Sequence, residues 1–218
     1  PRPFLPRIRA AGRRVILQVT SLAEAREAHA LGVDAIVAQG TEAGGHGTTG
    51  RTLFSLLPAV VDAVAPTPVL AAGGIADGRG LAAALTLGAQ GVLLGTRLFA
   101  TREALGSAAM KQRLVSAKGD STLRTRVFDL VRELDWPAPY TGRALANDFS
   151  TRWHGHEDAL RAALPAELAR YAAARDAGDL DTLVLFAGEC VDLITDCPPA
   201  GEVLARIAED ARQRLAAT

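Results

Sequence analysis

The stretch that decides the fold is Val33-Asp34-Ala35-Ile36-Val37-Ala38-Gln39-Gly40-Thr41-Glu42-Ala43-Gly44-Gly45-His46-Gly47. It begins with a short apolar run rich in β-branched residues, which is typical of a strand buried on both faces in a parallel sheet. A glycine-rich loop with one histidine follows at once. Parallel α/β proteins keep their chemistry just past the carboxyl ends of strands. The stretch therefore predicts a buried strand and a functional loop, with an ordinary glycine turn and a surface histidine as the alternative.

The same alternation of strand and helix continues on both sides of this stretch. Buried strands are expected over residues 15–19, 33–39, 69–72 and 91–94, and helices with one apolar stripe over 21–31, 52–64 and 77–87. Such alternation predicts right-handed βαβ units and a parallel sheet. Beyond residue 100 the period breaks, and helices are expected over 157–176, 183–195 and 201–215.

Composition limits the function classes. The chain has 218 residues, 49% of them hydrophobic, and its 24 basic and 24 acidic residues are interspersed. No basic stripe indicates a nucleic-acid partner, and no apolar run reaches the roughly 18 residues of a membrane span. Cys190 and Cys197 are too few for a disulfide framework, so we expect a reduced, cytoplasmic protein. Because the sequence begins with Pro1 rather than methionine, we also expect an upstream segment.

Two glycine turns follow the third and fourth expected strands. They are Gly73-Gly74 and Gly95-Thr96. In α/β barrels the last two strand-to-helix loops often bind phosphate through backbone N–H groups. The turns therefore predict a phosphate site, and simple tight turns are the alternative. Residues 45–50 also match the dinucleotide pattern GxGxxG, but the acidic residue expected about 20 positions further on is absent.

His46 is the candidate catalytic residue. No serine, cysteine or aspartate is arranged with it by spacing, and a metal site would require His29, His154 or His156, which are on a helix or distant in the sequence. We therefore expect no metal. Histidine titrates near neutral pH, so a loop histidine beside a cofactor is better interpreted as a general base.

Three stretches together resemble the nitronate monooxygenase family, formerly called 2-nitropropane dioxygenases. They are residues 38–46, 71–78 and 93–97, and with their strands they cover residues 15–100. Residues 141–147 and 188–189 resemble tail segments of the same family.

The resemblance implies an α/β fold, a TIM-type (β/α)8 barrel that binds FMN. Of this barrel the chain would hold the last four βα units, as a first domain of residues 1–125, with a helical tail of residues 126–218 packed on it. His46 would be the catalytic base. The cofactor would be held by Gln18, Gln39, Gly44, Gly45, Gly73, Gly74, Leu93, Leu94, Gly95 and Thr96.

The activity implied is oxidation of nitronates or nitroalkanes, such as propionate 3-nitronate, to a carbonyl compound and nitrite with O2. Flavin-dependent enoyl-acyl-carrier-protein reductases share the EAGGH and AAGGIADG stretches, so a reductase is one alternative and an inactive half-barrel is another. A complete barrel needs about 250 residues. Residues 1–218 alone should therefore expose strand edges, self-associate and bind FMN weakly.

Overall fold

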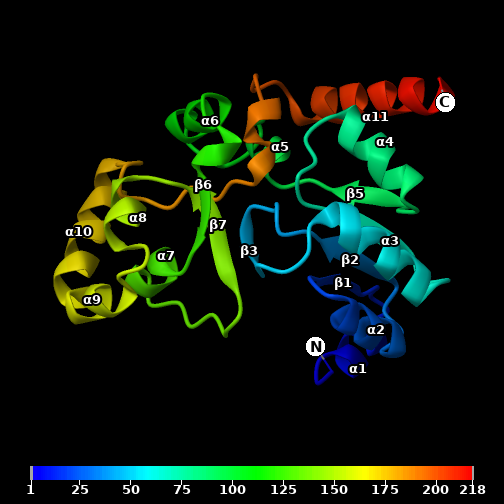
Figure 1. The fold of residues 1–218 in the computed structure, drawn as a ribbon, viewed down its shortest axis with the longest axis horizontal. Coiled ribbons are helices and arrows are strands. Elements are labelled where there is room, and N and C mark those ends of the chain that lie inside the picture. Colours follow the sequence, from blue (N-terminus) through cyan, green and yellow to red (C-terminus); the bar gives the residue numbers. More distant parts are fainter. Residues whose placement is uncertain (1, 218) are drawn as a thin grey trace. The chain divides into compact units, whose positions relative to one another are not determined.

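The computed structural model describes residues 2–217, which form two compact units (Figure 1). Unit 1 comprises the described residues of 1–42, 50–94 and 201–218. Unit 2 comprises residues 43–49 and 95–200. No helix within residues 2–217 is both long and apolar enough to cross a membrane.

Unit 1 is built on a four-stranded parallel sheet. Its strands, in the spatial order β1-β2-β4-β5, are β1 (Ile16–Val19), β2 (Ala35–Gln39), β4 (Val69–Ala72) and β5 (Gly91–Leu93). Its helices are α1 (Leu5–Ala10), α2 (Leu22–Ala30), α3 (Leu53–Val64), α4 (Gly78–Thr86) and α11 (Ala200–Ala216). All four strands and the helices predicted over 21–31, 52–64, 77–87 and 201–215 are confirmed.

The two faces of this sheet differ in what covers them. Ile36, Ala38 and Ala71 pack into a core with residues of α2 and α3, such as Leu56 and Val60. On the other face, Ile16 remains 60% exposed and Leu93 44% exposed. The parallel α/β class is therefore confirmed, while the eight-stranded barrel stays a prediction.

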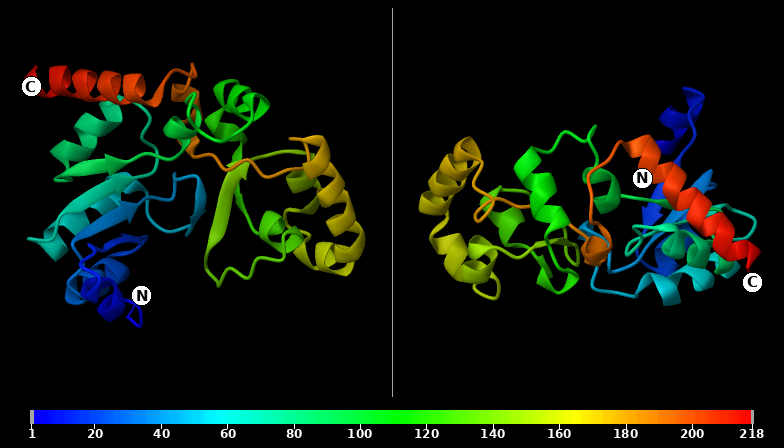
Figure 2. Two further views of the ribbon diagram at one scale, coloured as in Figure 1. Left: turned by 180° about the vertical axis from the view of Figure 1, so that it is seen from behind. Right: turned by 90° about the horizontal axis from the view of Figure 1, so that it is seen from above.

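Unit 2 contains a three-stranded antiparallel sheet that the sequence did not predict. Its order is β3-β7-β6, with β3 (Gly45–Gly47), β6 (Thr122–Thr125) and β7 (Thr141–Leu145). Its helices are α5 (Thr96–Phe99), α6 (Ala108–Val115), α7 (Val127–Val131), α8 (Asp148–Trp153), α9 (Glu157–Ala162), α10 (Leu164–Ala177) and the 3₁₀ turns η1 (Gly119–Ser121) and η2 (Glu189–Leu193). Figure 2 shows β7 in yellow-green, with α8 to α10 to one side of it in the left view.

Two helix predictions need correction. The α-helix expected over 183–195 is wrong. Leu185 O accepts a hydrogen bond from Leu145 N and Phe186 bridges to Ala144, so the first part of the segment runs extended beside β7, and only the 3₁₀ turn η2 follows. The helix expected over 157–176 is two helices. Pro165 lies in the first turn of α10, where a missing N–H is tolerated, and would break a continuous helix.

The predicted tail is also not purely helical, since β7 lies within it. Residues 95–200 pack as one unit, so the boundary predicted at residue 125 does not coincide with a boundary between the units. Packing of residues 126–218 on a barrel stays a prediction.

Candidate active site

His46 lies in the middle of β3, and its ring is held by a buried carboxylate in unit 2. Its Nε2 is 2.9 Å from Oδ1 and 3.0 Å from Oδ2 of Asp129 in α7. The side chain of Asp129 is 4% exposed and that of His46 14% exposed. A carboxylate this buried accepts a hydrogen bond from an imidazole N–H strongly, because little water competes for it.

The local sequence around Asp129 explains its position. Thr125 Oγ1 accepts a hydrogen bond from Val127 N at 3.2 Å, just before α7 begins. Val127 and Phe128 then pack in an apolar core. Their burial draws the first turn of α7, which includes Asp129, into unit 2. The same core includes Tyr171, whose pKa is raised by burial and, to a smaller extent, by the Asp129 charge.

Two aromatic side chains contact the His46 ring. Trp136 stacks on it with a centroid separation of 3.8 Å and an interplanar angle of 9°, and Phe186 is tilted at 5.4 Å. Gly142 pairs with His46 across the sheet, and a Cβ there would lie 2.8 Å from Phe186 Cε1. Trp136 is tethered in turn, because Arg126 Nη2 donates to its carbonyl oxygen at 3.1 Å. The ring is therefore fixed by packing as well as by Asp129.

This arrangement determines which nitrogen of His46 is basic. Since Nε2 faces two carboxylate oxygens, the neutral ring carries its proton on Nε2, a tautomer assigned from the hydrogen bond. Nδ1 is then the nitrogen that accepts a proton. The carboxylate thus holds the ring in this tautomer, as in other His–Asp pairs.

The glycine turn after β4 in unit 1 has an unusual backbone conformation. Gly73 and Gly74 have φ values of 104° and 70°, and residues other than glycine rarely adopt such backbone angles. Within the residues described here, their backbone N–H groups have no hydrogen-bond acceptor. Successive N–H donors in such a turn fit a phosphate.

Gly95 and Thr96 supply comparable donors in unit 2. Neither backbone N–H has an acceptor among the described residues, and a Cβ at Gly95 would meet no atom within 4 Å. Thr96 Oγ1 accepts a hydrogen bond from Gly188 N at 2.9 Å, which leaves its hydroxyl proton for donation elsewhere. These residues therefore fit the phosphate part of a cofactor.

Four further residues that were predicted to hold the cofactor differ in their surroundings. Gln18 Nε2 donates to Gln39 Oε1 at 2.8 Å, so these side chains form an amide pair on the less covered face of the unit 1 sheet. Gly44 has a packing reason to be glycine, because a Cβ there would lie 2.6 Å from Gly188 N. Gly45 has a φ of 74° and open space around it.

The predicted site residues are divided between the units. Unit 1 holds Gln18, Gln39, Gly73, Gly74, Leu93 and Leu94, and unit 2 holds Gly44, Gly45, His46, Gly95 and Thr96. Sequence reasoning missed Asp129, Trp136 and Phe186. The one available signal was a charged residue inside the apolar run Val127-Phe128-Asp129-Leu130-Val131.

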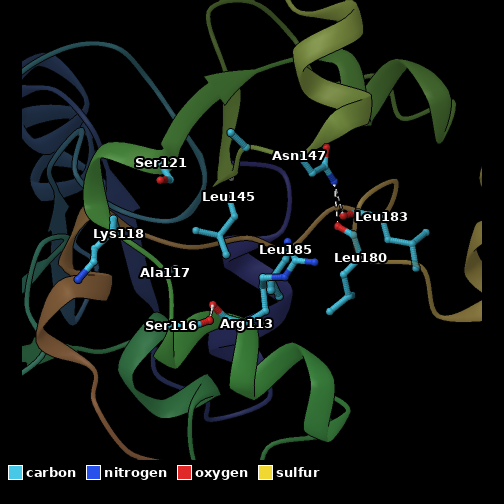
Figure 3. Close-up of a pocket in the computed structure, with 11 residues that line it drawn as sticks. Arg113, Ser116, Ala117, Lys118, Ser121, Leu145, Asn147, Leu180, Leu183 and Leu185 are labelled. Carbon is cyan, nitrogen blue, oxygen red and sulfur yellow. Dashed lines mark hydrogen bonds between the residues drawn. The ribbon is translucent and has the colours of Figure 1, made fainter.

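A separate cavity of about 220 Å³ lies in unit 2 and contains none of the predicted residues (Figure 3). Its polar groups largely satisfy one another. Arg113 is paired with Asp181 at 2.8 Å, and Asn147 Nδ2 donates to the carbonyl oxygens of Leu180 and Leu183. In Figure 3 the Lys118 side chain points away from the leucines that line the cavity. Nothing in this lining selects a ligand.

A parallel sheet with glycine turns after its strands, in one chain with a histidine held by a buried carboxylate, is typical of an α/β enzyme. The family model for nitronate monooxygenase matches residues 2–210. The chain therefore belongs to the nitronate monooxygenase family.

The individual relatives include a nitronate monooxygenase and also a protein named as a dehydrogenase. The nitronate monooxygenase of Neurospora crassa is 35% identical over 221 residues, which cover 95% of this chain and 56% of that protein. The (3aS,4S,5R,7aS)-5-hydroxy-7a-methyl-1-oxo-octahydro-1H-indene-4-carboxyl-CoA dehydrogenase of Mycobacterium tuberculosis is 35% identical over 248 residues, covering 97% of this chain and 69% of that protein. The chain thus spans just over half the length of the Neurospora relative.

Two solved structures are similar along the whole chain. Nitroalkane oxidase from Streptomyces ansochromogenes has a TM-score of 0.82 at 32% identity, covering 100% of this chain and 63% of that one. FabK from Thermotoga maritima has a TM-score of 0.82 at 30% identity, covering 99% and 66%.

Proposed function

We propose that the protein is an FMN-dependent enzyme that oxidises nitronates and nitroalkanes, such as propionate 3-nitronate, to a carbonyl compound and nitrite with O2. The observation that carries the proposal is the His46–Asp129 pair, with Nε2 of the ring 2.9 Å from the buried carboxylate, in a chain of this family. A neutral nitroalkane must lose its α-proton before it can be oxidised, and this pair is a base suited to that step.

The chain's own residues divide the work. Nδ1 of His46 takes the α-proton, and Asp129 stabilises the charge that the ring acquires. The N–H donors of Gly73, Gly74, Gly95 and Thr96 would hold the flavin phosphate, and Gln18 and Gln39 would contact the flavin. Bound flavin supplies the electron transfer to O2. A nitronate has already lost its proton and requires no base.

A second candidate is an FMN-dependent enoyl-acyl-carrier-protein reductase. It is supported by the similarity to FabK, whose TM-score equals that of the nitroalkane oxidase. The two functions differ in the electron donor, because the reductase takes hydride from a nicotinamide and the monooxygenase takes electrons from its own substrate.

Mixing the complete, flavin-loaded protein with NADPH under anaerobic conditions tests this difference. We expect the flavin absorbance to remain unchanged with NADPH, and nitrite to form from propionate 3-nitronate in air. Rapid bleaching by NADPH without nitrite formation would contradict the proposal and favour the reductase. Cytoplasmic location and self-association stay predictions from the sequence.

A further inference from the structure

We propose that Asp129 is the positioning residue of His46: it keeps the ring proton on Nε2 and thereby makes Nδ1 the atom that removes the substrate's proton. This inference rests on the proposed role of His46 as a base and extends it to a second residue, 83 positions away in the chain.

The geometry points to this role. Both Asp129 oxygens lie at nearly equal distances from the same nitrogen, 2.9 and 3.0 Å, so the Nε2–H is directed at the carboxylate as a whole. Turning the ring over about its Cβ–Cγ bond would exchange Nε2 with the Cε1 carbon and so break both contacts with the carboxylate. Trp136, stacked at 3.8 Å, opposes the same rotation.

Burial strengthens the inference. A carboxylate that is only 4% exposed is costly to keep charged, and such a charge is normally retained only with a partner. Within residues 2–217, His46 is the basic side chain that pairs with Asp129. An apolar residue would suit the neighbouring Val127 and Phe128 better, so Asp129 serves the histidine rather than the core.

The first test measures the tautomer directly in the complete wild-type protein. The ¹⁵N shifts of the His46 ring nitrogens, recorded at a pH where the ring is neutral, should show a protonated Nε2 and an unprotonated Nδ1. The opposite assignment would overturn the proposal. This readout does not depend on which substrate the enzyme uses, so it separates the role of Asp129 from the proposed function.

The second test compares Asp129→Asn with wild type, and Asp181→Asn serves as a matched control far from His46 in the sequence. For Asp129→Asn we expect kcat/KM for nitroethane to fall about 10²- to 10⁴-fold, because the base is no longer fixed in its tautomer. Propionate 3-nitronate turnover should change less than about fivefold. Equal losses on both substrates, or unchanged nitroethane turnover, would contradict the proposal.

Discussion

The two units hold their candidate functional groups in different ways. Unit 1 presents backbone donors at Gly73 and Gly74, immediately after the parallel strand β4. Unit 2 presents a side chain, His46, whose position depends on Asp129, Trp136 and Phe186. Donors of the first kind follow from the path of the backbone alone. A base of the second kind requires several side chains to be in place, so it is more sensitive to substitution.

The comparison between the two units is tested most strongly by replacing His46, the proposed base. His46→Asn should lower kcat/KM for nitroethane by about 10²- to 10⁴-fold, because general-base catalysis is removed. Propionate 3-nitronate should be affected much less. Steady-state kinetics on both substrates, with flavin content measured in each preparation, checks this. Equal losses would show that unit 2 contributes more than a base.

The glycine loop of unit 2 should be less tolerant of a side chain than the open glycines elsewhere. Gly44→Ala would place Cβ 2.6 Å from backbone atoms of Ala187 and Gly188, which cannot move as a flexible side chain does. We expect a loss of about 1–3 kcal/mol in the free energy of unfolding. Gly201→Ala, where a Cβ meets nothing within 4 Å, is the control and should lose none. Urea denaturation of both variants would decide.

Gly95 allows cofactor binding to be separated from stability. Its φ is −100° and a Cβ would meet no protein atom, so Gly95→Ala should leave the unfolding free energy unchanged. If this turn receives the flavin phosphate, the added methyl group should weaken FMN binding about tenfold, or about 1.4 kcal/mol. Fluorescence titration of FMN measures this. Unchanged affinity would remove Gly95 from the phosphate site. Gly74 is a poorer test, since its φ of 70° strains any side chain.

The smallest expected effect concerns a helix start in unit 1. Asp77 accepts hydrogen bonds from Arg79 N and Gly80 N at the start of α4. Asp77→Ala should cost about 1 kcal/mol of unfolding free energy, and Asp77→Asn should cost much less, because asparagine caps helices equally well. Nitroethane turnover should stay unchanged in both.

The pH dependence of this cap has a definite sign. Burial raises the pKa of Asp77, but the hydrogen bond from the Arg79 side chain and those from the backbone outweigh it, so the pKa lies below its ordinary value. The charge of Asp77 therefore stabilises the fold above the ordinary range of the carboxyl, and this contribution is lost as the pH falls through the lowered pKa. The stability difference between wild type and Asp77→Asn should disappear in acid.

The sequence predicted unit 1 far better than unit 2, and the reason lies in which residues pair. In unit 1 the register joins Ile16 to Ala35 and Leu70 to Gly91, strands separated by a single helix. In unit 1 the spacing of the apolar residues and the helix-capping residues are enough to predict the strands and helices. In unit 2, β3 consists of Gly45-His46-Gly47, which has no strand propensity, and it forms only because β7 pairs with it.

The same distinction applies to the candidate site. His46 and the glycine turns are visible in the sequence because each follows an apolar strand. Asp129 is not, since its relation to His46 arises only when α7 packs in the unit 2 core. The segment 183–195 has the apolar residues of a helix, but the pairing of its first part with β7 overrides that local preference.

The separation of His46 and Asp129 also has a consequence for synthesis. The two residues are 83 positions apart. At about 5–20 residues per second, the ribosome adds the carboxylate about 4–17 s after the histidine. Throughout that interval β3 has no strand to pair with, because β7 follows later still. A nascent chain that already contains every residue of the parallel sheet therefore cannot yet have the His46–Asp129 pair.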